Sequence, residues 1–264
     1  RIPVRTRSRT SAVTKERGRP LGRFGSDFDI SVLFRIIILD GPTLPYFCTV
    51  SHRNKEDSME LFASPMACSL ASHITAVEAG LPVKVRFVEN KKTDEGEDYF
   101  AISPHGYVPA LRLDDGRILN EGPSVLQYLA DRKPEAGLAP AWGTMERYEL
   151  IDALNYLSTE VHKRIFANVF SQTAGEATKA AARALFEPTL AYLAKRLGSR
   201  DHLVGSGFTV ADAYLVTLLN WFGFVGVDLT KWPTIHAYHQ KHLKRPSVAT
   251  AMGVEMAERK RRAA

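Results

Sequence analysis

Cysteine is scarce in this chain, whose 264 residues contain only Cys48 and Cys68. Two thiols build neither the disulfide framework of a small secreted domain nor the four ligands of a structural zinc site. We therefore expect a reducing, cytoplasmic location and no metal. The chain also lacks a run of about 20 uncharged apolar residues, which a membrane-spanning helix needs. The nearest run, residues 30–39, carries Arg35, so we expect no membrane partner.

A broad excess of positive charge is missing as well. The formal net charge is +6, but +5 of it lies in residues 1–58. Nucleic-acid binding needs a basic patch on the folded body, so we expect no nucleic-acid partner. Residues 1–24 are rich in Arg, Ser and Thr, which faintly suggests a transit peptide. We favour a disordered or non-native extension over residues 1–58, with a misplaced start or a fragment as its origin and the real start at Met59.

From Met59 onward the pattern predicts alternating strands and helices. A strand, a helix and a period-two strand form a β-α-β unit, which implies a parallel strand pair. A polar loop with a short helix follows, and then a hairpin and a helix with Pro near its first turn. The order predicts a small α/β domain with a mixed sheet over residues 59–134. Its main elements are expected at residues 59–63, 67–79, 83–88, 108–119 and 121–131.

Strand signals are absent after a linker at residues 133–143, which is rich in Pro and Gly. We expect an all-helical domain over residues 145–264. Thr209 and Asp212 match a capping box, which we interpret as a folding signal worth about 1 kcal/mol and not as chemistry. The expected helices cover residues 145–170, 176–197, 210–222, 232–243 and 248–259, and the third is nearly all apolar.

Cys68 is the first candidate for chemistry, because it lies where a strand ends and a helix begins. The positive end of a helix dipole would stabilise its thiolate. A small buried core residue is an equally good reading. Residue 65 is Pro, so the chain has no C-x-x-C motif, and a redox role would require a second thiol from outside the chain.

Two short motifs suit a peptide-like ligand. Pro109 opens a strand, and a cis bond after Val108 would turn the Val108 backbone outward to pair with such a ligand. A plain edge-strand proline explains the motif equally well. Glu121 precedes Gly122 at a helix start, where the carboxylate could bind an ammonium group and the Gly122 N–H a carboxylate. A simple helix cap is the alternative.

A polar stripe is the last candidate. Asp152, Asn155, Thr159, His162 and Phe166 recur at steps of three and four, so they share one helix face. This face either lines a cleft or faces water. His162 together with the next residue, a lysine, would suit an anion.

Taken together, these features resemble the glutathione transferase family, and its bacterial beta class in particular. The resemblance covers residues 59–258 and implies a thioredoxin-like domain followed by an all-helical domain, the glutathione transferase fold, assembled as a homodimer. It implies an enzyme that conjugates glutathione, its co-substrate, to small hydrophobic electrophiles, an activity used in detoxification. The motifs that carry it lie at residues 64–73, 108–111, 119–122, 154–156, 159–163 and 208–214.

The resemblance also implies site residues. Cys68 would face the glutathione sulfur and could form a mixed disulfide with it, and Cys68, Ser69 and His162 form the expected catalytic group. Lys92, or its neighbour Lys91, would join the site. The remaining expected glutathione contacts are Val108, Pro109, Glu121, Gly122, Thr159, Glu160, Val161 and, toward the partner subunit's glutathione, Asn155.

Some positions depart from the family, and alternatives remain. Ala63 stands where several classes place a catalytic tyrosine, and Met66 replaces a common glycine. A glutathione-dependent thiol–disulfide oxidoreductase or peroxidase that uses Cys68 is one alternative. A non-catalytic binding relative on the same fold is the other.

Overall fold

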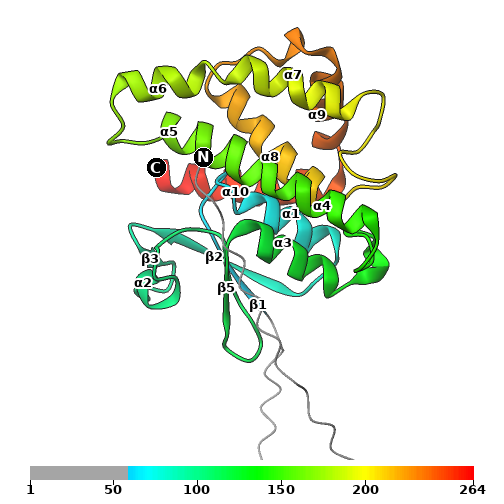
Figure 1. Ribbon diagram of the computed structural model, residues 1–264. Helices are drawn as coiled ribbons and strands as arrows, with labels where there is room; N and C mark the ends of the chain where they lie inside the picture. Colours follow the sequence, from blue (N-terminus) through cyan, green and yellow to red (C-terminus); the bar gives the residue numbers. More distant parts are fainter. Residues whose placement is uncertain (1–58) are drawn as a thin grey trace, which may run out of the picture. The chain divides into compact units, whose positions relative to one another are not determined.

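A five-stranded mixed sheet is the first layer of the structure, a computed structural model that describes residues 59–264. The predicted extension, residues 1–58, lies outside the described residues. The strand order is β3-β2-β1-β4-β5, with β1 parallel to β2 and antiparallel to β4 (Figure 1). This confirms the β-α-β unit and the hairpin, while the short β3 was not predicted. The strands are β1 (Met59–Ala63), β2 (Val83–Glu89), β3 (Lys92–Thr93), β4 (Ala110–Arg112) and β5 (Ile118–Asn120).

Helices cover both faces of this sheet. Successive side chains of a strand point to opposite faces, so Leu61 packs with α1 (Leu70–Glu78) and α3 (Gly122–Asp131). Phe62 packs on the other face with α2 (Tyr99–Ile102). The thioredoxin-like arrangement expected from the sequence is therefore present. Helix α1 begins at Leu70, three residues later than predicted, because residues 64–69 form tight turns instead.

The second layer is entirely helical. The predicted helix at residues 145–170 is continuous, but its middle is a π-helix, in which each N–H bonds five residues back. The predicted helix at residues 176–197 is interrupted at residues 184 and 185. The elements are η1 (Pro134–Ala136), α4 (Met145–Tyr156), η2 (Leu157–Phe166, the π-helix), α5 (Ala167–Val169), α6 (Glu176–Arg183), α7 (Phe186–Leu197), α8 (Val210–Phe224), η3 (Leu229–Lys231), α9 (Pro233–Leu243) and α10 (Pro246–Ala263).

Helix α8 is the buried centre of this layer, as predicted, and its capping box is confirmed. The buried carboxylate of Asp212 accepts hydrogen bonds from the N–H and the hydroxyl of Thr209 at 2.8 and 2.9 Å. It also accepts the N–H of Leu203 and the hydroxyl of Tyr238, both at 2.7 Å. One carboxylate thus joins the start of α8, the preceding loop and α9.

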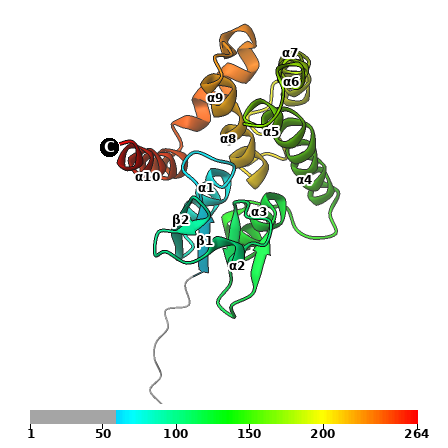
Figure 2. The ribbon, with the colours of Figure 1, turned by 90° about the vertical axis from the view of Figure 1, so that its left-hand side faces the viewer.

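The two layers meet along α1, which packs against α8 and α10 (Figure 2). Glu255 of α10 is fully buried, and its side chain accepts the backbone N–H of Met66 at 2.6 Å and contacts Nδ1 of His73 at 3.1 Å. Trp221 of α8 donates its indole N–H to the carbonyl of Met66 at 2.9 Å. The helical layer therefore holds the loop that leads to Cys68. No helix of residues 59–264 combines the length and the apolar character needed to cross a bilayer.

Candidate functional site

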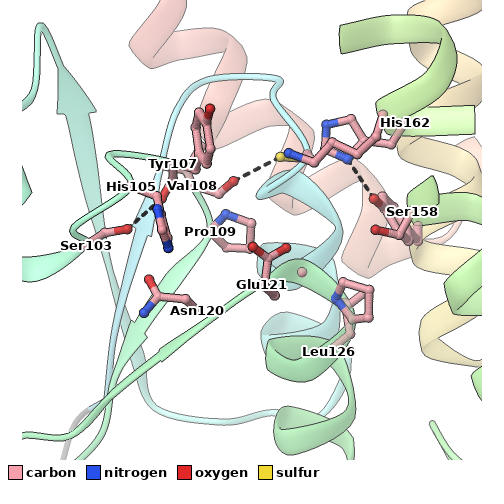
Figure 3. Close-up of a pocket in the computed structure, with 15 residues that line it drawn as sticks. Ser103, His105, Tyr107, Val108, Pro109, Asn120, Glu121, Leu126, Ser158 and His162 are labelled. Atoms are coloured by element: carbon pink, nitrogen blue, oxygen red, sulfur yellow. Dashed lines mark hydrogen bonds between the residues drawn. The ribbon is translucent and has the colours of Figure 1, made fainter.

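A polar cavity opens where the loop after β1, the start of β4, the start of α3 and the π-helix meet (Figure 3). Five residues of the cavity wall were predicted as site residues from the sequence, together with His162. The wall also contains Ser103 and Ser158, which the sequence did not indicate, and Lys163, which the sequence paired with His162 as a site for an anion. The predicted members are Cys68, Val108, Pro109, Glu121 and Gly122.

The thiol of Cys68 is half-buried in this cavity and donates a hydrogen bond to the Val108 carbonyl at 3.1 Å. Burial raises the pKa of Cys68 to about 11, although the positive charge of Lys163 and the backbone N–H groups act to lower it. A thiolate stabilised by the helix terminus was one reading of the sequence. Because α1 starts only at Leu70 and burial dominates, the structure instead favours the neutral thiol.

Ser69 does not reach the cavity. Its hydroxyl is fully buried, accepts the N–H of Ser64 at 3.1 Å and faces the Ser64 carbonyl at 3.3 Å. The side chain thus closes the turn that positions its neighbour Cys68. In this orientation the Ser69 hydroxyl lies outside the cavity, and its expected catalytic role stays a prediction.

The backbone around Val108 presents polar groups to the cavity. The Val108–Pro109 bond is cis, as expected. The preceding carbonyl of Tyr107 accepts the buried Tyr99 hydroxyl at 2.8 Å, which holds this segment against α2. The Val108 N–H donates no hydrogen bond within residues 59–264. An extended peptide lying along Val108 would therefore find one donor and one acceptor on the main chain.

Glu121 adopts a left-handed backbone conformation, with φ of +65°, directly before α3. A non-glycine residue in this region carries strain, which is typical of functional sites. The carboxylate is exposed in the cavity wall and forms no ion pair within the described residues (Figure 3). Gly122 begins α3, where the first N–H groups lack partners inside the helix. The pair offers an acceptor for a cation beside donors for an anion.

His162 lies in the π-helix and faces the cavity (Figure 3). Its Nδ1 is 2.8 Å from the Tyr214 hydroxyl, and its ring packs edge-on against Trp221 with centroids 5.1 Å apart. Burial, followed by the nearby Lys163 charge, lowers the pKa of His162 to about 4. The imidazole is therefore neutral at physiological pH and can donate or accept one hydrogen bond at each nitrogen.

Asn155, Thr159, Glu160 and Val161, the other predicted residues of this helix, do not line the polar cavity. Val161 is fully buried in the helical core. Glu160 pairs with Arg164 at 2.7 Å, and Thr159 donates to the Asn155 carbonyl at 3.0 Å. The predicted stripe assumed α-helical spacing. In the π-helix the turn is wider, and His162 of the predicted stripe lines the cavity together with Ser158 and Lys163. No pattern in the sequence predicted this change of helix type.

Lys91 and Lys92 were the two alternatives for the lysine at the site. Lys91 follows Asn90 in a left-handed turn between β2 and β3, and its Nζ donates to the Gly106 carbonyl at 2.8 Å. It lines a recess that adjoins the polar cavity and shares Cys68 and Val108 with it. Lys92 lies on β3, exposed and outside these cavities. Of the two lysines, Lys91 lies beside the polar cavity, whereas Lys92, the expected site residue, does not.

A second cavity of about 710 Å³ adjoins the first and is lined mainly by apolar side chains. Both cavities share Cys68 and His162. Phe170 lines this cavity, whereas Phe166 and Phe222 of the neighbouring aromatic cluster are fully buried. The other walls come from the loop at residues 65–67 and from Asn220, Trp221, Phe224 and Arg259.

Within the described residues there is one cluster of potential metal ligands, at His202, Asp212 and His242, and none of the three lines these cavities. The Asp212 oxygens already accept four hydrogen bonds, two at each oxygen. A carboxylate with its lone pairs occupied in this way is a poor ligand, because coordination would break buried hydrogen bonds. We therefore interpret these three side chains as part of the packing around α8 and not as a metal site.

Comparison with known proteins decides the family. Family models for the glutathione S-transferase N-terminal and C-terminal domains match residues 65–132 and 176–241. Glutathione S-transferase GstA of Escherichia coli O157:H7 is 42% identical over 199 residues, which cover 75% of this chain and 98% of that protein. This chain belongs to the glutathione S-transferase family.

Solved structures of bacterial transferases agree. The glutathione transferase of Methylococcus capsulatus is 46% identical, with a TM-score of 0.73 over 75% of this chain and 99% of the other. A beta-class glutathione S-transferase of Sphingomonas chungbukensis is 42% identical, with a TM-score of 0.72 over 74% and 98%. A sphingomonad transferase complexed with glutathione is 43% identical, with the same TM-score and coverage. The predicted likeness to the beta class is confirmed.

Proposed function

We propose that this glutathione S-transferase conjugates the sulfur of glutathione to small hydrophobic electrophiles. The observation that carries this proposal is that Cys68 and His162 line both the polar and the apolar cavity. A thiol peptide bound in the polar cavity would have its sulfur at the boundary. An electrophile in the apolar cavity would meet it there, so binding alone would bring the two reactants together.

The polar groups suit a γ-glutamyl tripeptide. The Glu121 carboxylate would bind the ammonium of the head group, and the N–H groups at the start of α3 would bind its α-carboxylate. The main chain of Val108 would pair with the peptide backbone. Lys91 and Lys163 would balance the remaining negative charge of the tripeptide. A similar sphingomonad enzyme that binds glutathione in its crystal structure supports this ligand.

Ionising the glutathione thiol is the chemical problem at the site. Lowering a thiol pKa from about 9 to about 7 raises its thiolate fraction at neutral pH roughly 50-fold. The neutral Cys68 thiol would donate its S–H to this thiolate, turning from the Val108 carbonyl. The Lys163 ammonium would stabilise the negative charge from nearby. If the Tyr214 hydroxyl donates to Nδ1 of His162, the neutral ring carries a proton on Nε2 and is a further donor.

Thiol–disulfide exchange is the second candidate, because Cys68 lies at the boundary where the glutathione sulfur would sit. That reaction needs Cys68 as a thiolate nucleophile and a glutathione thiol to resolve the mixed disulfide. A pKa of about 11 leaves little thiolate at neutral pH. The raised pKa, together with the hydrogen bond that the thiol already donates to Val108, favours Cys68 as a hydrogen-bond donor over Cys68 as a nucleophile.

Cys68→Ala separates these functions, with Cys48→Ser as the matched control. We expect conjugation of glutathione to 1-chloro-2,4-dinitrobenzene to fall by less than about 10-fold in Cys68→Ala, since one neutral donor is lost. The assignment of Cys68 as a hydrogen-bond donor would be overturned by two results together. The wild-type protein would reduce hydroxyethyl disulfide with glutathione, and Cys68→Ala would lose both this activity and conjugation. A wild-type protein that is not retained on a glutathione column would favour the non-catalytic relative.

We further propose a cytoplasmic homodimer that acts in detoxification. Large apolar side chains near the start of α4 are strongly exposed in the single chain, among them Trp142 and Met145, and such a patch is typical of a contact surface. Light scattering should give twice the chain mass.

Cell fractionation would test the cytoplasmic location, and growth of a deletion strain on toxic electrophiles would test the role in detoxification. The domain limits at residues 59–134 and 145–264 stay predictions, which limited proteolysis can check.

A further inference from the structure

The apolar cavity contains one charged side chain. Of the ten residues that line it, Arg259 alone carries a formal charge at neutral pH, because Cys68 and His162 are both neutral there. The other walls are apolar or uncharged, with Phe170, Trp221 and Phe224 contributing aromatic rings. Arg259 is exposed and lines this cavity, so its guanidinium is accessible to an anionic ligand that enters the cavity.

Arg259 has no carboxylate partner within residues 59–264. Its neighbours on α10 do: Arg261 and Arg262 pair with Glu258 at 2.6 and 2.9 Å. The other acid of this stretch, Glu255, points inward and is fully buried. The cation at Arg259 is therefore available to a ligand in the cavity, whereas Arg261 and Arg262 both pair with Glu258.

The side chain of Arg259 is oriented by an aromatic ring. Its guanidinium lies 5.1 Å from the centroid of Phe224, a cation–π contact that keeps it at the cavity wall. Phe170 packs edge-on against both Trp221 and Phe224, with centroids 5.6 and 6.2 Å apart. Phe170 and Phe224 remain 42% and 64% exposed. These rings offer surface to a planar aromatic ligand, beside a guanidinium that can bind a carboxylate with two parallel hydrogen bonds.

We propose that Arg259 makes this site selective for aromatic electrophiles that carry a carboxylate. The inference rests on the proposed function and adds the substrate class. In the reaction, the glutathione thiol gives its proton to solvent and its sulfur forms a bond to the ring carbon. In an aryl halide substrate, the halide leaves that carbon with the bonding electron pair. The carboxylate is unchanged and serves only to orient the ring.

A matched pair of substrates tests the charge alone. 4-Chloro-3-nitrobenzoate and 4-chloro-3-nitrobenzamide share size and leaving group and differ in charge. We expect Arg259→Gln to lower kcat/KM for the benzoate about 10-fold, the scale of a lost charge-assisted hydrogen bond, and to leave the benzamide within about two-fold. Arg259→Lys should fall between, and added salt should reduce the wild-type preference. Arg261→Gln, on the same helix but outside the cavity, is the control and should change neither value.

An unchanged benzoate-to-benzamide ratio in folded Arg259→Gln, as judged by circular dichroism, would overturn the inference. Binding without glutathione separates this from a failure of the proposed function. Quenching of tryptophan fluorescence can follow unreactive 4-methyl-3-nitrobenzoate and its amide. Tighter binding of the acid that disappears in Arg259→Gln supports the anion site even if no conjugation is found. Equal affinities of wild-type protein for acid and amide refute it even if conjugation proceeds.

Discussion

The Cys68 thiol should react slowly with alkylating reagents at neutral pH. Burial raises its pKa from 9.0 to about 11. The thiolate is the reactive form. At pH 7 a thiol with this pKa is ionised to about one part in 10⁴, compared with about one part in 10² for the ordinary value. The alkylation rate at Cys68 should therefore be about 100-fold below that of an unperturbed thiol.

The measurement uses Cys48→Ser protein, in which Cys68 is the remaining cysteine. Iodoacetamide labelling is followed by mass spectrometry between pH 6 and pH 10. The logarithm of the rate should rise with pH without a plateau. Two charge variants bracket the result. Lys163→Gln removes a charge that lowers the Cys68 pKa and should slow labelling, whereas Glu121→Gln removes one that raises it and should speed labelling.

A labelling rate that reaches its plateau below pH 8 would refute this reasoning. Cys68 would then be a thiolate at neutral pH and could not donate to the glutathione sulfur. The same result would favour the oxidoreductase alternative, since a low thiol pKa is what that reaction needs. If Lys163→Gln sped labelling and Glu121→Gln slowed it, the charges of Lys163 and Glu121 would not act on the Cys68 pKa in the expected directions.

Three further predictions concern stability and binding. Burial lowers the pKa of His162 from 6.5 to about 4, so between these values the unfolded chain binds a proton that the folded chain does not. Urea unfolding should show about 2 kcal/mol of stability lost from this group between pH 7 and pH 5, and His162→Gln should lose less over the same range. Asp212→Ala leaves four buried donors unpaired and should cost about 3–5 kcal/mol in the same assay, whereas Asp228→Ala, an exposed cap, should cost about 1 kcal/mol; equal costs would contradict the network. Glu121→Gln should weaken glutathione binding in calorimetry about 10-fold or more, with exposed Asp115→Asn as the unchanged control.

Local patterns explain why much of the fold was predictable. The strand at residues 83–88 follows from period-two alternation, and the short strand at residues 59–63 ends at a Ser-Pro stop. The start of α8 follows from a cap that acts within four residues. These patterns act through interactions between residues close in the sequence and do not depend on distant contacts. The π-helix at Leu157–Phe166 and the break between α6 and α7 lack such a local signal. Both lie where helices pack on one another, so tertiary contacts decided them.

The same division applies to the site. Glu121, Val108 and Pro109 were placed by short motifs at element ends, where backbone geometry dictates what is exposed. The orientation of Ser69 was not predictable in this way. Because α1 begins only at Leu70, Ser69 lies in the turn before the helix, and its hydroxyl bonds to Ser64 of the same loop. Arg259 was not singled out at all. Its place in the apolar cavity depends on α10 returning across the first layer, about 190 residues after the loop it faces.

The amino-acid sequence alone determined the order of strands and helices, the two-layer architecture and the identity of the cysteine, carboxylate and proline at the site, because each follows from interactions within a few residues. Tertiary structure alone decided which side chains share a cavity and which protonation state they hold. Burial is the physical reason. The pKa values of Cys68 and His162 depend chiefly on water excluded by segments far away in the chain, and no local pattern records that exclusion.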